Sequence, residues 1–272
     1  MFWTNLLLLA AAAFSLTLNT LFIVKCSELQ ACLTGAFSAL LTALAYLTMR
    51  SRLVFKHSNE GASSLPKNVA IISIALIGAA SLALGLLLEF RHMVSVQQLI
   101  VLATLAALTF LYFIPISLKK DGKRLRDIYW LKHFVVGANW SLATVAFPCG
   151  FNKTTAFIGF FMQVFFLIAA LSMSFDLRDA ALDVEEKHRS FLLSVGETKL
   201  KQLSILLLLC CAVSLLFSET HVITTVIRIS LLAFSAITIW NAKPNDASAK
   251  FNVVLESVIL LYGLAVLPML LA

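Results

Sequence analysis

Charge is scarce in this sequence. Only 13% of the 272 residues are Asp, Glu, Lys or Arg, whereas an ordinary soluble domain carries about 25% charged residues. Hydrophobic residues make up 60% of the chain, and the mean hydropathy is +0.94. This composition excludes a water-soluble globule and a disordered chain. The protein must be solvated mainly by lipid.

Glycine, proline and cysteine are also few. Ten Gly and five Pro exclude collagen-like sequence and a chain dominated by linkers. The five cysteines form no CxxC pair and no Cys/His spacing of a zinc site. The motifs GxGxxG, GxxxxGK and HExxH are absent, as is a Ser-His-Asp arrangement. Nucleotide-loop, zincin and triad-hydrolase chemistry are therefore not expected.

Long apolar runs dominate what is present. A membrane-spanning helix needs roughly 20 mostly apolar residues, and nine such runs are bounded by charge, Pro or Gly. We expect an all-α, polytopic membrane protein that forms one integral-membrane domain over residues 1–272. The expected spans are 4–24, 29–49, 68–88, 97–117, 133–149, 154–175, 202–218, 221–240 and 252–271.

Positive charge is distributed unevenly between the loops. The loops after spans two, four, six and eight hold 17 of the 21 Lys and Arg residues, and the opposite loops hold only Lys25, Arg91 and Lys153. Because cytoplasmic loops collect positive charge, we expect a cytoplasmic N-terminus, an external C-terminus and a site that opens to the cytoplasm. The formal charge of +7 then reflects membrane orientation and not nucleic-acid binding. The sequence also favours a bacterial inner membrane.

The end of span six carries the clearest motif. Asp176, Asp179 and Asp183 follow the pattern DxxDxxxD, which at about 100° per residue places three carboxylates on one face of a continuing helix. Like charges repel at this spacing, and Mg²⁺ is a natural counter-ion because it prefers carboxylate oxygens and shares its shell with phosphates. Alternatively, this is a solvated helix balanced by Arg178 and Lys187.

This segment resembles the second aspartate-rich motif of the UbiA superfamily of intramembrane prenyltransferases. Thirteen residues after Asp183 comes Gly196, at the family's spacing, and Arg189-Ser190-Phe191 stands where the family usually has Lys-Thr-Leu. Nine spans with a cytoplasmic N-terminus also match that superfamily in layout. The resemblance implies a bundle of nine transmembrane helices around a central cavity, in which a prenyl group passes from a prenyl diphosphate to a hydrophobic acceptor.

The resemblance also implies roles for individual residues. Asp176, Asp179 and Asp183 would bind Mg²⁺ on the diphosphate. Basic side chains bind phosphate oxygens well at the edge of a low-dielectric region, although a basic loop also anchors to anionic lipid. The expected diphosphate-binding residues are Lys123, Arg124, Arg126 and Arg189.

The sequence lacks the superfamily's first aspartate-rich motif. No acidic residue lies between Glu28 and Glu60, where the end of span two should supply carboxylates. A non-catalytic relative that binds an isoprenoid or a partner is therefore the alternative. A small transporter is a further alternative, with Arg228, Glu256 and Gln163 marking its pathway.

Two ionisable residues lie inside expected spans. A charged group is costly at the centre of a membrane helix, so Arg228 should face the bundle interior, with Glu256 as its expected partner. Asn139 and Gln163 also lie within spans, where they either line a cavity or form hydrogen bonds between helices.

Overall fold

The protein is helical throughout the part that the structure describes. The computed structural model describes residues 2–24, 34–43, 95–113, 128, 130–149, 154–180, 191–218, 221–244 and 249–266, and no strand occurs in these ranges. The all-α prediction is thus confirmed for these residues.

The described part of the chain is a succession of helices. Residues 34–43 are helical. The other helices are α1 (Phe2–Val24), α4 (Val96–Phe113), α5 (Leu131–Ser141), η2 (Leu142–Ala146), α6 (Phe147–Cys149), α7 (Thr155–Arg178), α9 (Phe191–Val195), α10 (Glu197–Ser214), η3 (Leu215–Phe217), α11 (Val222–Asn241) and α12 (Ala249–Leu264).

The described helices overlap eight of the nine expected spans, whereas the short helix α9 was not expected. The third expected span, 68–88, lies outside the described residues, so the count of nine spans and the central cavity stay predictions. By length and composition, three described helices are long and apolar enough to cross a membrane: α7, α10 with η3, and α11. The length and hydropathy of these helices are those of an integral membrane protein.

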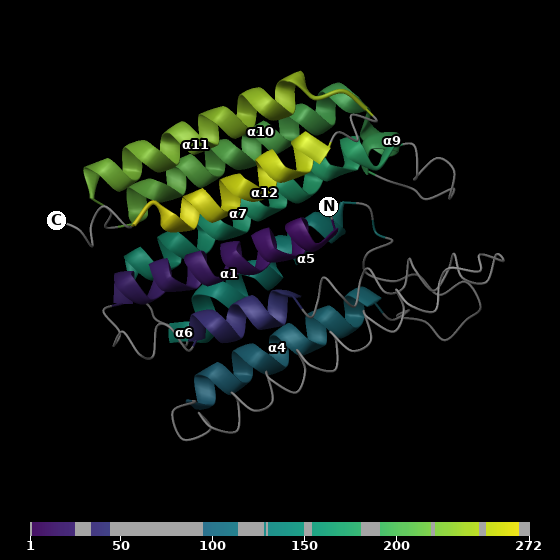
Figure 1. Ribbon diagram of the computed structural model, residues 1–272. Helices are drawn as coiled ribbons and strands as arrows, with labels where there is room; N and C mark the ends of the chain where they lie inside the picture. The colour runs from purple at the N-terminus through teal and green to yellow at the C-terminus, as the bar shows by residue number, and fades with distance from the viewer. Residues whose placement is uncertain are drawn as a thin grey trace, which may run out of the picture.

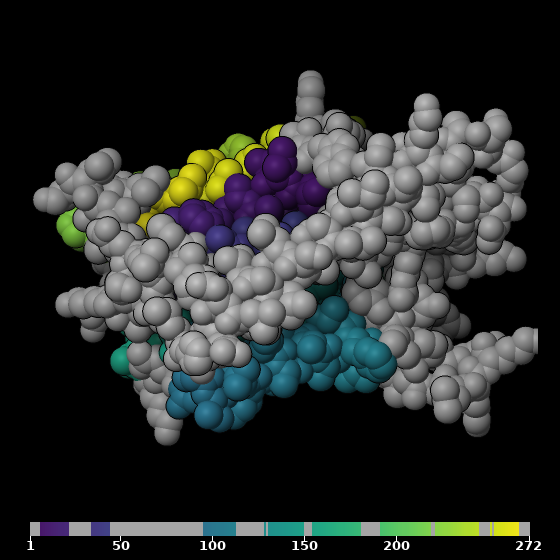
Figure 2. All heavy atoms as spheres, turned by 60° about the horizontal axis from the view of Figure 1, so that its bottom comes forward, coloured from purple at the N-terminus to yellow at the C-terminus, as the bar shows by residue number. Residues whose placement is uncertain are grey.

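Helix α7 is the centre of the bundle. It packs mainly against α5 and α10 and also contacts α1 and α12, and Figure 1 shows it between these helices. About 61% of its most apolar stretch is buried, against 28% for α11. Helix α1 packs against α12, and Figure 2 shows both on one face of the molecule, with α4 on the far side of α1 from α12. A side chain on α7 therefore meets protein, whereas many on α11 meet lipid.

Local sequence explains where α7 begins. The Thr154 side chain accepts a hydrogen bond from the Phe157 N–H at 3.3 Å, which satisfies one of the free amides at a helix N-terminus. Apolar residues then continue to Ser174 without proline. The helix ends at Arg178, and Asp179 is its C-cap.

A proline changes the course of the helix formed by α5, η2 and α6. Pro148 has no N–H to donate to the carbonyl of Thr144, four residues earlier. The turns before it form a π-helix, Leu142–Ala146, and the Thr20 hydroxyl of α1 donates to the Thr144 carbonyl at 2.9 Å. Likewise, Ser38 donates to the Ala143 carbonyl at 3.0 Å. Polar side chains of neighbouring helices thus replace bonds that water would provide outside the membrane.

One glycine brings α5 close to α7. A Cβ at Gly137 would lie 2.7 Å from the Phe165 carbonyl oxygen, a backbone atom that cannot rotate away. Small residues allow membrane helices to approach in this way. This close packing fixes the start of α5 relative to the end of α7, where the polar side chains gather.

The Thr20 hydrogen bond provides a test of the fold. We expect Thr20→Val to lower the free energy of unfolding by about 1 kcal/mol, because the Thr144 carbonyl loses its donor. Thr104→Val is the matched control, since its exposed hydroxyl bonds only to the Ile100 carbonyl of its own helix. Unfolding in mixed detergent and SDS micelles measures both changes. Equal losses in the two variants would contradict the role given to Thr20.

Candidate functional site

Asp176 is the buried carboxylate at the polar end of the bundle. Its residue is only 4% exposed, and three helices meet around it. The Lys132 Nζ of α5 lies 2.6 Å from Oδ1 in an ion pair, and the Phe191 N–H at the start of α9 donates to Oδ2 at 3.2 Å. A buried carboxylate needs such partners, because its desolvation costs several kcal/mol.

His133 lies beside the same carboxylate. Its Nε2 is 3.4 Å from Asp176 Oδ2, but the geometry is not that of a hydrogen bond, and Nε2 has no hydrogen-bond partner. On the other side of the ring, Nδ1 is 3.1 Å from the Ser172 hydroxyl. The imidazole is fully buried and meets the Phe191 ring edge-on. His133 therefore packs the inner wall of the Asp176 site.

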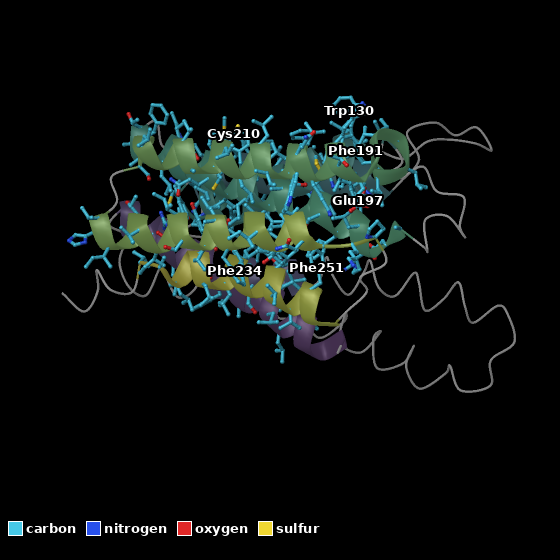
Figure 3. The ribbon with its side chains drawn as sticks, turned by 90° about the horizontal axis from the view of Figure 1, so that it is seen from above. Trp130, Phe191, Glu197, Cys210, Phe234 and Phe251 are labelled. Carbon is cyan, nitrogen blue, oxygen red and sulfur yellow. The ribbon has the colours of Figure 1, made fainter. Side chains whose placement is uncertain are left out.

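The chain around α9 places the Phe191 amide. Gly196, at a positive φ of 83°, separates α9 from α10, and its N–H donates to the Leu192 carbonyl at 2.8 Å. Glycine adopts this backbone conformation without the cost that a Cβ brings. Figure 3 shows Trp130, Phe191 and Glu197 at the same end of the bundle. The glycine expected from the aspartate-motif resemblance thus serves as the bend between α9 and α10.

Asp179 is held differently from Asp176. Its two carboxylate oxygens accept hydrogen bonds from Arg178 Nε and Nη2, at 2.5 and 2.6 Å, and the Arg178 guanidinium also lies over the Phe175 ring. The pair is partly exposed. Asp179 therefore lies at the outer rim of the site, and Asp176 lies inside it.

The continuous acidic face expected over Asp176, Asp179 and Asp183 stays a prediction. Helix α7 ends at Arg178 with Asp179 as its C-cap, and the Asp179 N–H still donates to the Phe175 carbonyl at 3.1 Å. The Asp176 and Asp179 carboxylates bind different cations. Asp183 lies outside the described residues. The same holds for the expected diphosphate-binding residues Lys123, Arg124, Arg126 and Arg189.

The donor set around these carboxylates does not by itself fit a divalent metal. Within the described ranges, no three His, Cys, Asp or Glu side chains form a group that could hold a metal ion. Both oxygens of Asp176 and both of Asp179 already face cations or N–H groups of the chain. The assignment of Mg²⁺ to Asp176, Asp179 and Asp183 stays a prediction.

Sequence reasoning missed two residues of this site. Lys132 counted only as one more cytoplasmic positive charge, and His133 had no expected role. A signal was present, because Lys132 and His133 begin an apolar span at the membrane boundary, at the depth expected for Asp176. Nothing in the sequence, however, pairs two residues 44 positions apart.

Arg228 belongs to a second polar cluster, and the prediction of a partner in Glu256 was wrong. The fully buried guanidinium donates from Nη1 to the Gln163 Oε1 at 3.2 Å and lies over the rings of Phe160 and Tyr262. The Tyr262 hydroxyl donates to the same Gln163 oxygen at 3.0 Å. No ion pair joins Arg228 to Glu256 in the described chain, where Glu256 Oε2 has no hydrogen-bond partner.

Gln163 of α7 connects its own helix to α10, α11 and α12 through this cluster. Besides accepting from Arg228 and Tyr262, its amide donates to the Ser218 hydroxyl at 2.8 Å and to the Ser214 carbonyl. The expectation of a hydrogen bond between helices is thus confirmed for Gln163. It lies 13 residues before Asp176 on α7, about 20 Å along the helix, so this cluster is separate from the Asp176 site.

The cluster of Gln163, Arg228 and Tyr262 should contribute to the stability of the bundle. We expect Gln163→Leu to lower the free energy of unfolding by about 1 to 3 kcal/mol, because Arg228 and Tyr262 would lose their shared acceptor while remaining buried. Met162→Leu, at an exposed position next to it, is the matched control and should stay near the wild-type value. Mixed-micelle unfolding measures both. A loss no larger than that of the control would mean that the cluster does not support the bundle.

Comparison with solved structures shows the same fold in a membrane enzyme. A structure of digeranylgeranylglyceryl phosphate synthase, a prenyltransferase of the UbiA superfamily, superimposes with a TM-score of 0.63. The alignment covers 97% of this chain and 96% of that one, at 16% sequence identity. The two chains therefore share an all-helical fold over nearly their whole length, whereas the nine spans and the central cavity stay predictions.

Sequence comparison adds nothing to this likeness. No protein-family model matches the chain, and no curated protein matches its sequence. The similarity lies in the arrangement of helices, and the chemistry must be argued from the site itself.

Proposed function

We propose that the protein is a UbiA-like membrane prenyltransferase, which transfers a prenyl group from a prenyl diphosphate to an aromatic or lipid acceptor. The main support is the position of Asp176. The carboxylate lies at the end of the central helix of a fold shared with a membrane prenyltransferase, at the same end of the bundle as the cations Lys132 and Arg178.

The reaction follows from the chemistry of the donor. The bond between the allylic carbon and the diphosphate oxygen breaks, and its electron pair leaves with the diphosphate. The allylic carbon then bonds to the acceptor, which loses a proton. Positive charge near the leaving oxygens stabilises this transition state, and an apolar bundle protects the allylic cation from water.

The basic residues would meet the diphosphate. Lys132 is accessible enough to reach a ligand, because 23% of its side chain is exposed. The resemblance adds Lys123, Arg124, Arg126 and Arg189 from the neighbouring loops, and the buried Phe191 ring offers an apolar surface at this end of the bundle. The prenyl chain would extend from this end into the membrane.

Mg²⁺ is the cofactor proposed from the resemblance, with Asp176, Asp179 and Asp183 as ligands. When bound, it would neutralise the leaving diphosphate. Lys132 and Arg178 hold the two described carboxylates, so a metal at these positions would have to displace the chain's own cations.

A binding protein without catalysis is the second candidate. It is favoured by the missing first aspartate-rich motif and by the two neutralised carboxylates. Such a protein would gain thermal stability with a prenyl diphosphate and would release no pyrophosphate. The transporter hypothesis loses its motivation, because Arg228 and Gln163 are bound to each other.

Activity tests the proposal. The protein in liposomes, given geranyl, farnesyl or geranylgeranyl diphosphate with Mg²⁺ and a panel of aromatic and lipid acceptors, should release pyrophosphate and form a prenylated product. Asp179→Asn should lower the rate at least about tenfold, because it removes one of the carboxylates proposed to hold Mg²⁺ on the diphosphate.

Glu197→Gln is the matched control. It also removes one carboxylate from an ion pair at this end of the bundle, between Glu197 and Lys201, and should keep the wild-type rate. An unchanged rate in Asp179→Asn would refute the role of that residue. Stabilisation by prenyl diphosphates without pyrophosphate release would instead identify a binding protein.

A further inference from the structure

The ion pair between Lys132 and Asp176 points to a role for the lysine that the aspartate motif alone does not give. We propose that the Lys132 ammonium takes the place of a divalent cation at Asp176, so that the diphosphate binds at this position without a metal. Asp176 then balances the charge of Lys132 and does not serve as a metal ligand. This inference rests on the proposed diphosphate substrate.

The first argument is the geometry of the ion pair. Nζ lies 2.6 Å from Oδ1, which is the distance of a strong charge-assisted hydrogen bond. A lysine ammonium carries three donors, and one points at Asp176. Among the described residues, no other acceptor contacts Nζ, and the side chain is partly exposed. The remaining donors can therefore serve a phosphate oxygen while the first stays on Asp176.

The second argument is the other side of the carboxylate. Oδ2 accepts from the Phe191 amide at 3.2 Å and has the His133 Nε2 at 3.4 Å. The imidazole is fully buried, and this nitrogen has no hydrogen-bond partner. The Lys132 ammonium at Oδ1 would repel a metal ion there, and nitrogen atoms of Phe191 and His133 lie beside Oδ2, so Asp176 is a poor metal ligand in this arrangement.

The third argument is charge balance. Mg²⁺ is usually held by one or two carboxylates together with the oxygens of substrate phosphates, whereas one lysine is already balanced by one aspartate. The helical residues 34–43 contain no acidic side chain, and none occurs between Glu28 and Glu60. With the first aspartate-rich motif missing and Asp179 bound to Arg178, a monovalent ammonium suits the Asp176 carboxylate better than a divalent cation.

Binding of inorganic pyrophosphate to the full-length protein in detergent tests this inference. Isothermal titration calorimetry is done once with EDTA and once with Mg²⁺. We expect the two dissociation constants of the wild type to agree within about threefold. Lys132→Met should weaken binding in EDTA by about tenfold or more, because a charge-assisted hydrogen bond is lost, and Lys132→Arg should restore most of it.

Asp176→Asn separates the two roles of the carboxylate by the sign of its effect. If Lys132 binds the diphosphate, removal of the neighbouring negative charge should leave binding in EDTA unchanged or make it tighter. If Asp176 is a metal ligand, the same change should weaken binding in Mg²⁺. This variant keeps the size of the side chain, so it decides the question even if Lys132→Met fails to fold.

Lys199→Met, at an exposed lysine at the start of α10, is the control for Lys132→Met, because it also removes one positive charge.

The outcomes also separate this inference from the proposed function. Pyrophosphate binding that requires Mg²⁺ and is lost in Asp176→Asn would overturn the inference and leave the prenyltransferase standing. The same is true if Lys132→Met binds pyrophosphate in EDTA as tightly as Lys199→Met. No binding in either buffer, together with no turnover of any prenyl diphosphate, would overturn both.

Discussion

The buried carboxylate of Asp176 is the constraint on which the polar end of this protein depends. An ionised group that is 4% exposed at the edge of an apolar bundle is stable only with close partners. Lys132 and the Phe191 amide supply them, and each belongs to a different helix. The requirement to neutralise one carboxylate therefore joins α5, α7 and α9, and it places a partly exposed lysine and a buried histidine at the polar end of the bundle.

The same physical rule operates deeper in the bundle, with different partners. Pro148 leaves the Thr144 carbonyl without its usual donor, and Thr20 of another helix replaces it. Arg228 is satisfied in part by Gln163 and by two aromatic faces, with no acid involved. Polar groups inside the bundle thus hold helices together, whereas those at the end of α7 keep a basic side chain within reach of a ligand.

Much of the architecture could be predicted from the sequence. Apolar runs of roughly 20 residues placed helices correctly wherever the structure describes them, because length and hydropathy alone decide whether a segment suits lipid. The DxxDxxxD spacing identified Asp176 and Asp179 as residues of interest. It did not show that α7 ends at Arg178, because no proline or glycine marks that end in the sequence.

Pairing between distant residues is what the sequence could not provide. By itself it determined solvation by lipid, the helical class and the acidic end of the central helix, because these follow from composition and local spacing. Only the tertiary structure decided that Asp176 binds Lys132, 44 positions away, and that Arg228 binds Gln163 and not Glu256. Partner choice depends on which faces the packed helices turn towards each other, and close contacts such as that of Gly137 with the Phe165 carbonyl set those faces.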